Sequence, residues 1–169
     1  LIEMVKNFHI DRFIFASSSS IYGDQKPFPK KENSEVNPIN LYSLSKLSNE
    51  QFAQSISKTI NTTMIGLRFF TIYGPWGRPD MMILKYLISA YKRLSFPLFN
   101  NGDHFRDFTY VKDVCKILKK LIYSKFKHQH SILNICSNKT LKLTNIIKMI
   151  DNLTLNKPKI KNKTLSLNE

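Results

Sequence analysis

The chain has 169 residues, of which 42% are hydrophobic, and its 26 Lys and Arg against 12 Asp and Glu give a formal net charge of +14 at pH 7. This length suits one domain with its own core, and no apolar run approaches the ~20 residues of a membrane span. No signal-peptide pattern opens the sequence, so we expect a cytoplasmic protein with no membrane partner.

The positive charge does not by itself predict a nucleic-acid partner. The basic residues are 21 Lys and five Arg, and the Lys are scattered along the chain. A nucleic-acid-binding face gathers its basic residues on one surface, so we expect no nucleic-acid partner. The arginines carry more information, because Arg grips phosphate or carboxylate with two parallel bonds that Lys cannot copy. Three of the five lie in the motifs described below: Arg68, Arg78 and Arg106.

Cysteine and histidine give no sign of a metal site. Cys115 and Cys136 have neither metal-ligand spacing nor the density of a disulfide scaffold, so we expect two buried thiols. The histidines are scattered without partners at metal-ligand spacing, and we expect all four on the surface: His9, His104, His128 and His130.

The first third of the chain predicts helix, strand, loop and helix in turn. Residues 1–8 are typical of the end of a helix, and the apolar, aromatic residues 12–16 of a buried parallel strand. Residues 25–38 are polar with three prolines and predict a surface loop. The next helix is capped near Asn40 and runs to about Thr59. We expect its apolar side to consist of Leu41, Leu44, Phe52 and Ile56.

The alternation continues to the end of the sequence. Residues 62–68 predict a second buried strand, residues 71–80 a Gly/Pro loop and residues 81–94 a helix. Further expected elements are strands at 98–99, 108–110 and 132–135, a helix from a cap at Asp113 to Tyr123, a helix at 143–153, and disorder beyond 156. Such alternation implies a parallel sheet with right-handed crossovers, and ligands of such sheets bind at the carboxyl ends of the strands.

Two groups of residues stand where this rule places a site. Ser17–Ser20 follow the first strand and continue into Ile21-Tyr22-Gly23, and the next helix carries Tyr42 and Lys46. Positions i and i+4 share one face of a helix, so the Lys46 ammonium lies near the Tyr42 phenol and favours its phenolate. The spacing therefore predicts a general base.

Two further motifs accompany this pair: Gly66–Met81, which reads GLRFFTIYGPWGRPDM, and Arg106–Val114, which reads RDFTYVKDV. Together the three blocks resemble the NAD-dependent epimerase/dehydratase family of extended short-chain dehydrogenases/reductases, and within it the UDP-glucuronate 4-epimerases. The resemblance runs from about residue 13 to about 150. It implies an α/β fold with a partial doubly wound, Rossmann-like parallel sheet and part of a substrate-binding region.

The resemblance also implies a division of labour along the chain. Residues 1–70 are expected to be the C-terminal part of the NAD-binding domain, residues 71–156 mostly the nucleotide-sugar-binding region, and residues 157–169 a polar tail. In the family, the sugar C4 hydroxyl loses its proton and the C4 hydride passes to the nicotinamide and returns to the other face of a rotated 4-keto sugar. The implied cofactor is NAD and the implied substrate is a UDP-sugar.

Each implied role belongs to a residue that matches the family motifs. Tyr42 is the base, Lys46 assists it and holds the nicotinamide ribose, and Ser18 or Ser19 hydrogen-bonds the C4 oxygen. Phe70 packs near the nicotinamide. The residues matching substrate contacts are Thr71 for the nucleotide sugar, Arg78 for the glucuronate carboxylate, Phe99 near the uracil, and Arg106 for the diphosphate.

The serine run separates the epimerases from related enzymes. The 4,6-dehydratases of the superfamily carry Asp-Glu after the hydroxyl residue, and UDP-glucuronate decarboxylases carry a Glu in that segment. Ser19 and Ser20 occupy those places here. Neutral hydroxyls cannot supply that acid and base, so the resemblance favours epimerisation, with another UDP-hexose epimerase, such as a UDP-glucose 4-epimerase, as a less favoured reading.

One departure from the family concerns the cofactor. Family members open with a Gly-x-x-Gly-x-x-Gly turn that receives the NAD pyrophosphate, whereas the five glycines of this chain stand at 23, 66, 74, 77 and 102. We therefore expect a fragment of an enzyme that is a homodimer at full length, and we expect the isolated chain to be inactive. The alternative from another class is a non-catalytic remnant or a UDP-sugar-binding module.

Overall fold

In the computed structural model, the described residues are 1–24, 26 and 28–164. They form two compact units, one of Leu1–Phe70 with Lys112–Cys136 and one of Thr71–Val111 with the segment from Ser137 onward. Each unit thus consists of two separate segments of the chain. Residues 71–156, expected mostly to form the nucleotide-sugar-binding region, are divided between the two units. Among the described residues, no helix has the length and apolar character needed to cross a membrane.

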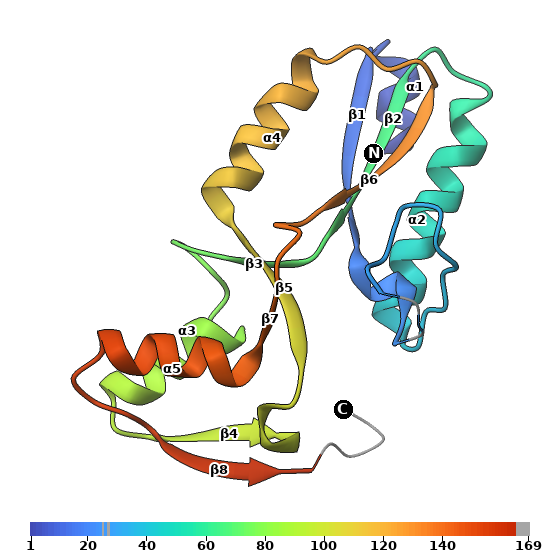
Figure 1. Ribbon diagram of the computed structural model, residues 1–169. Helices are drawn as coiled ribbons and strands as arrows, with labels where there is room; N and C mark the ends of the chain where they lie inside the picture. The colour runs from blue at the N-terminus through green and yellow to red at the C-terminus, as the bar shows by residue number, and fades with distance from the viewer. Residues whose placement is uncertain (25, 27, 165–169) are drawn as a thin grey trace. The chain divides into compact units, whose positions relative to one another are not determined.

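The first unit is built on a parallel sheet in the order β1-β2-β6, formed by β1 (Arg12–Ser18), β2 (Thr63–Phe69) and β6 (His130–Ile135) (Figure 1). β2 lies in the middle and is buried from Met64 to Arg68, as expected of a parallel strand covered on both faces. β2 therefore has a paired strand on each side. Among the described strands, only β2 pairs with β1.

The predicted helices of this unit are present as α1 (Ile2–Asn7), α2 (Leu41–Ser57) and α4 (Val111–Tyr123). Figure 1 shows α2 and α4 on opposite sides of the sheet. Asn40 caps α2 as predicted: its side chain accepts a hydrogen bond from the backbone N–H of Ser43 at 2.8 Å, and the Asn40 backbone N–H donates one to the Ser43 hydroxyl oxygen at 3.1 Å. This reciprocal pair satisfies two backbone N–H groups at the start of the helix.

The prediction of which side of α2 is buried was wrong. Leu41 and Phe52 are 85% and 61% exposed and Leu44 is also exposed, although Ile56 packs against the core cluster of Val5, Ala53 and Met64. The buried residues of the helix are Ser43, Glu50, Ala53 and Ser57. The reason is that α2 turns a hydrogen-bonding face, rather than its apolar stripe, toward the sheet.

The C-terminal end of α4 is held by Arg12 of β1. The Arg12 guanidinium donates to the carbonyl of Leu121 at 2.7 Å and to that of Ser124 at 2.6 Å, and it also contacts the carbonyl of Ile122. These bonds satisfy carbonyls that a helix end leaves without partners. At the other end of α4 the structure corrects two predictions: Asp113 lies inside the first turn and pairs with Lys116 instead of capping, and Cys115 is exposed.

The second unit contains α3 (Met82–Tyr91) and α5 (Leu143–Leu153) with five strands. The strands are β3 (Thr71–Tyr73), β4 (Ser95–Phe99), β5 (Phe105–Tyr110), β7 (Thr140–Lys142) and β8 (Lys159–Lys163). β5 pairs with β3 in parallel and with β7 in antiparallel, and β4 pairs with β8. The core consists of Tyr86, Phe96, Leu98, Phe108, Ile146, Ile147 and Ile150.

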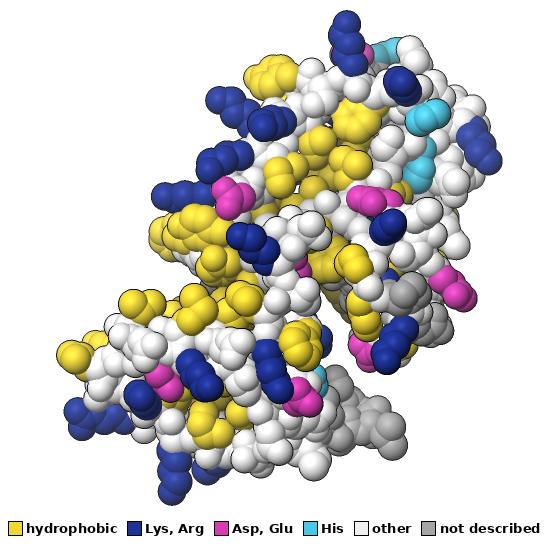
Figure 2. Space-filling view, in the orientation of Figure 1, with side chains coloured by type: hydrophobic (Ala, Val, Ile, Leu, Met, Phe, Trp, Pro, Cys, Tyr) yellow, Lys and Arg dark blue, Asp and Glu magenta, His cyan; other side chains and the backbone are white. Residues whose placement is uncertain are grey.

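Two predictions for this unit need correction. Residues 159–163, expected in a disordered tail, form β8, because the backbone of β4 offers a parallel partner that needs no apolar side chains. Residues 71–73, expected in a loop, form β3 beside β5. The basic side chains of each unit are spread over the face shown in Figure 2.

Candidate active site

The predicted Tyr42–Lys46 pair is formed on α2 at the carboxyl end of β1. The Lys46 Nζ lies 5.7 Å from the centroid of the Tyr42 ring, and it donates a hydrogen bond to the carbonyl oxygen of Ala16 at 3.0 Å. Tyr42 is 56% exposed. The ammonium is therefore fixed to the sheet while it faces the phenol, and the phenol is open to a ligand.

The serine run divides into residues with different surroundings. Ser17 is buried, and its hydroxyl donates to the Glu50 carboxylate. Ser18 is the last residue of β1, and its Oγ accepts hydrogen bonds from the Ser20 backbone N–H at 3.2 Å and the Ser20 hydroxyl at 2.9 Å. In this arrangement the Ser18 O–H can donate to a ligand. Ser19, the other candidate, is half-buried and opens the 3-10 helix η1 (Ser19–Tyr22).

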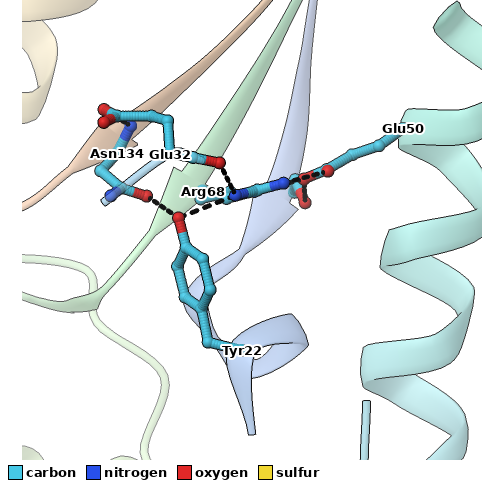
Figure 3. Close-up of polar contacts among 6 residues, drawn as sticks. Tyr22, Glu32, Glu50, Arg68 and Asn134 are labelled. Atoms are coloured by element: carbon cyan, nitrogen blue, oxygen red, sulfur yellow. Dashed lines mark hydrogen bonds and ion pairs between the residues drawn. The ribbon is translucent and has the colours of Figure 1, made fainter. Parts of the chain in front are cut away.

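A buried polar network that the sequence did not reveal joins residues of β2, α2 and β6 (Figure 3). Arg68 of β2 makes two parallel bonds to Glu50 of α2, from Nε to Oε1 at 2.9 Å and from Nη2 to Oε2 at 2.7 Å. Its Nη1 donates to the Tyr22 hydroxyl at 2.8 Å and to the Glu32 carbonyl at 2.9 Å. The Tyr22 hydroxyl in turn donates to Asn134 of β6 at 2.7 Å.

The network has clear electrostatic consequences. Burial lowers the pKa of the Arg68 guanidinium, but the bonds to Glu50 and Tyr22 outweigh this effect and raise it above its ordinary value. Burial raises the pKa of the Tyr22 phenol, and the hydrogen bond with Arg68 opposes the increase. Arg68 therefore carries its charge in the interior, where its fork binds the carboxylate of the protein itself. A charged residue within a buried strand was the signal that could have predicted such a partner.

The other predicted site residues lie on separate elements. Phe70 follows β2 and is half-buried, and its backbone N–H donates to the Ile135 carbonyl at 3.1 Å. In the second unit, Thr71 opens β3 opposite Phe108, and Phe99 ends β4. Arg106 of β5 is exposed and donates from Nη1 to the Phe105 carbonyl at 2.9 Å.

Arg78 already binds a carboxylate in this structure. Its Nε donates to Asp80 Oδ1 at 3.1 Å, and its Nη2 contacts Oδ2 of the same residue. Both side chains are exposed, and the hydrogen bond from Arg78 lowers the pKa of Asp80. The contact is a two-bond fork on a surface loop.

The histidines are not all on the surface as predicted. His9 and His128 are exposed, but His130 of β6 is half-buried, and its Nε2 has no hydrogen-bond partner among the residues that the structure describes. Burial lowers the pKa of His130, although the charge of Glu50 opposes the decrease. Across residues 1–24, 26 and 28–164, no group of three or more His, Cys, Asp or Glu is arranged to hold a metal ion.

The sequence profile of the NAD dependent epimerase/dehydratase family matches residues 1–136. The chain belongs to this family. Among its relatives, Protein CapI of Staphylococcus aureus is 41% identical over 124 residues, which cover 72% of this chain and 37% of that protein. UDP-glucuronate 4-epimerase 4 of Arabidopsis thaliana is 39% identical over 108 residues, which cover 61% of this chain and 24% of that protein.

The fold of this epimerase/dehydratase chain is also found in solved structures. The UDP-glucuronic acid 4-epimerase from Bacillus cereus, solved in complex with UDP-glucuronic acid and NAD, matches with a TM-score of 0.90 at 27% identity, covering 97% of this chain and 52% of that one. The predicted Rossmann-like α/β class is therefore confirmed. The chain spans less than half the length of the curated relatives named above.

Proposed function

We propose that the chain carries the catalytic helix and the hydroxyl-bearing strand of an NAD-dependent nucleotide-sugar epimerase, and that its substrate is UDP-glucuronate. The observation that carries this proposal is the Tyr42–Lys46 pair, with the ammonium fixed to Ala16 of β1 two residues before Ser18. This arrangement supports the proposal, because a phenol and an ammonium lie beside a strand that ends in a hydroxyl-bearing residue. The relatives that act on UDP-glucuronate support the choice of substrate.

The residues present fit one end of NAD. Lys46 offers an ammonium and Tyr42 an exposed phenol at the carboxyl end of a parallel strand, where the ligands of such sheets bind, and these groups suit the nicotinamide ribose. The five glycines form no Gly-rich turn, so the chain offers no such cradle for the pyrophosphate. When bound, NAD supplies a hydride acceptor that later returns the hydride.

The proton chemistry belongs to the chain's own side chains. The Tyr42 phenolate accepts the proton of the sugar C4 hydroxyl, and the Lys46 ammonium offsets the negative charge of that phenolate beforehand. Ser18 donates a hydrogen bond to the C4 oxygen as the C–O bond gains carbonyl character. On the way back, Tyr42 returns the proton to the same oxygen, so no net proton is consumed. We place Ser18 in this role ahead of Ser19 because its hydroxyl accepts two bonds and keeps its own proton to donate.

The proposed substrate contacts lie in the residues that follow β2. We assign Arg78 to the glucuronate carboxylate, since its fork already makes two contacts to the Asp80 carboxylate, and a uronate would replace that partner. Arg106 is assigned to the diphosphate, Thr71 to the sugar and Phe99 to the uracil. If Arg78 served only Asp80, a neutral sugar such as that of UDP-glucose would bind equally well.

We also propose that the functional form is a homodimer. The exposed stripe of Leu41, Leu44 and Phe52 runs along α2, and such a stripe is a surface that a second copy can cover. The proposal applies to the full-length form, so sedimentation of a chimaera in which the Bacillus cereus enzyme completes residues 1–169 tests it, with Phe52→Lys as the variant expected to favour the monomer.

Turnover tests the proposed activity. Because the relatives are longer than this chain, the assay uses a chimaera in which residues 1–169 replace the matching segment of the Bacillus cereus enzyme. We expect conversion of UDP-glucuronate to UDP-galacturonate, followed by the anomeric proton signals of the two sugars. Binding of UDP-glucuronate by a folded chimaera without conversion would instead favour the alternative of a UDP-sugar-binding module.

A further inference from the structure

We propose that Glu50 and Arg68 are positioning residues: their buried ion pair locks helix α2 onto the carboxyl ends of β1 and β2 and thereby sets where Lys46 and Tyr42 stand. The catalytic part of this inference rests on the function proposed above. Neither Glu50 nor Arg68 is assigned a contact with substrate or cofactor.

On helix α2, residue spacing places the three side chains that matter on one face. Tyr42, Lys46 and Glu50 follow one another at intervals of four residues and share one face of α2. Two of them are bonded to consecutive residues of β1, Lys46 to the Ala16 carbonyl and Glu50 to the Ser17 hydroxyl. A movement of α2 that breaks the bond between Glu50 and Ser17 therefore also shifts Lys46 relative to the Ala16 carbonyl. Tyr42 moves with the same part of the helix.

On the strand side, the Arg68 guanidinium connects Glu50 to the turn that bears Ser18. Ser17 and Arg68 are directly paired in the β1–β2 register, and both bind Glu50. Arg68 also donates to Tyr22, the last residue of η1, whose first turn is capped by Ser18. One buried guanidinium thus connects the helix that bears the base to the turn that presents the hydroxyl.

Burial and charge make this a firm link. The side chains of Arg68 and Glu50 are only 7% and 6% exposed, so salt and water screen their attraction little. The planar fork makes two parallel bonds to the carboxylate and further bonds to Tyr22 and the Glu32 backbone, a pattern that a lysine ammonium cannot reproduce. This accounts for an arginine at position 68 in a chain with 21 lysines.

The position of Lys46 can be measured without any turnover. The chain contains three alanines, at positions 16, 53 and 90, so carbonyl-¹³C alanine labelling gives three NMR signals. The Lys46→Met variant identifies the Ala16 signal, because it removes the hydrogen bond to that carbonyl. Ala90 lies in the second unit and serves as the internal reference.

Two variants of Glu50 are then compared with a surface control. Glu50→Gln keeps the side-chain shape but removes the charge, and Glu50→Asp keeps the charge but draws it back, which provides a second variant if Glu50→Gln fails to fold. We expect both to move the Ala16 signal toward its position in Lys46→Met while the Ala90 signal stays in place. The control, Asp113→Asn, breaks the exposed pair with Lys116 and should leave the Ala16 signal unchanged.

The outcomes separate positioning from mere stabilisation. A folded Glu50 variant with reduced stability but an unmoved Ala16 signal would show that the ion pair is structural only. If none of the three alanine signals responds to Lys46→Met, the premise that Lys46 bonds the Ala16 carbonyl is removed. In the active chimaera, we expect folded Glu50→Asp to lower kcat by about ten- to a hundredfold, as a misplaced group does, with KM for UDP-glucuronate within about twofold. If the chimaera turns over no substrate, the function proposed above fails, whereas the NMR result still decides the positioning.

Discussion

The buried pair of Arg68 and Glu50 should show strong energetic coupling in a double-mutant cycle. Replacing either partner by Met leaves the other charge buried without a counter-charge, which costs about 3–5 kcal/mol of the free energy of unfolding. Replacing both removes both charges and leaves only neutral groups to satisfy. The polar groups that then lose a partner are the Ser17 hydroxyl, the Tyr22 hydroxyl and the Glu32 carbonyl.

The magnitude follows from these contacts. Tyr22 keeps its bond to Asn134, so the double variant leaves chiefly the Ser17 and Glu32 groups unsatisfied, at about 1–3 kcal/mol each, partly offset by the apolar side chains introduced. The two single costs together exceed that of the double variant, and we expect a coupling of at least about 2 kcal/mol. Exposed pairs couple far more weakly, so Asp113 with Lys116 is the matched control at less than about 1 kcal/mol.

The assay is urea unfolding of the unaltered chain and the three variants, followed unit by unit. The carbonyl signals of Ala16 and Ala53 report the first unit and that of Ala90 the second, which avoids forcing one two-state transition on two units. For independent sites, the losses in free energy of unfolding of the two single variants add up to that of the double variant within about 0.5 kcal/mol. Such additivity would refute the view that these two charges depend on each other.

The remaining predictions concern the active site and its surroundings. In the chimaera, Tyr42→Phe should lower turnover by roughly 10²-fold or more, as loss of a general base does, and unaltered turnover would remove Tyr42 from the mechanism. Arg78→Ala should weaken UDP-glucuronate binding by ~1.5–3 kcal/mol, the worth of a charge-assisted bond, with much less effect on UDP-glucose; equal losses in calorimetry would show that Arg78 does not read the carboxylate. Burial lowers the pKa of His130 below 6.5. As the pH falls, the imidazole of His130 is therefore protonated in the unfolded chain at a higher pH than in the folded chain. The free energy of unfolding should therefore decrease from about pH 7 to about pH 5, and His130→Gln, but not His128→Gln, should flatten that slope. The 169-residue chain without a Gly-rich turn should bind NAD only weakly, and micromolar affinity in calorimetry would contradict this.

Local patterns predicted the elements that local interactions determine. The Asn40 cap, the strands β1 and β2 and the Tyr42–Lys46 pair all follow from residues a few positions apart, and all are present. The inward face of α2 could not be predicted in this way. Its buried Glu50 depends on Arg68, 18 residues further along the chain, and no periodicity within the helix encodes that partner.

The second unit shows the same limit. β8 consists of five exposed residues rich in lysine, so its composition is that of a solvated segment, and only the backbone of β4 makes it a strand. The arginines illustrate both outcomes. At position 68 a two-bond fork is present, but it serves the fold. The substrate roles assigned to Arg78 and Arg106 remain predictions.

The fate of the C4 hydrogen tests the proposed chemistry most directly. The chimaera is given UDP-glucuronate deuterated at C4, with its Tyr42→Phe variant as the control for activity of the host enzyme. Because the hydride leaves C4 and returns to the same carbon, we predict UDP-galacturonate that keeps the deuterium at C4. A product that has exchanged this deuterium for solvent hydrogen, or no product from a folded chimaera that binds UDP-glucuronate and NAD, would contradict the assignment of this chain as part of an NAD-dependent 4-epimerase.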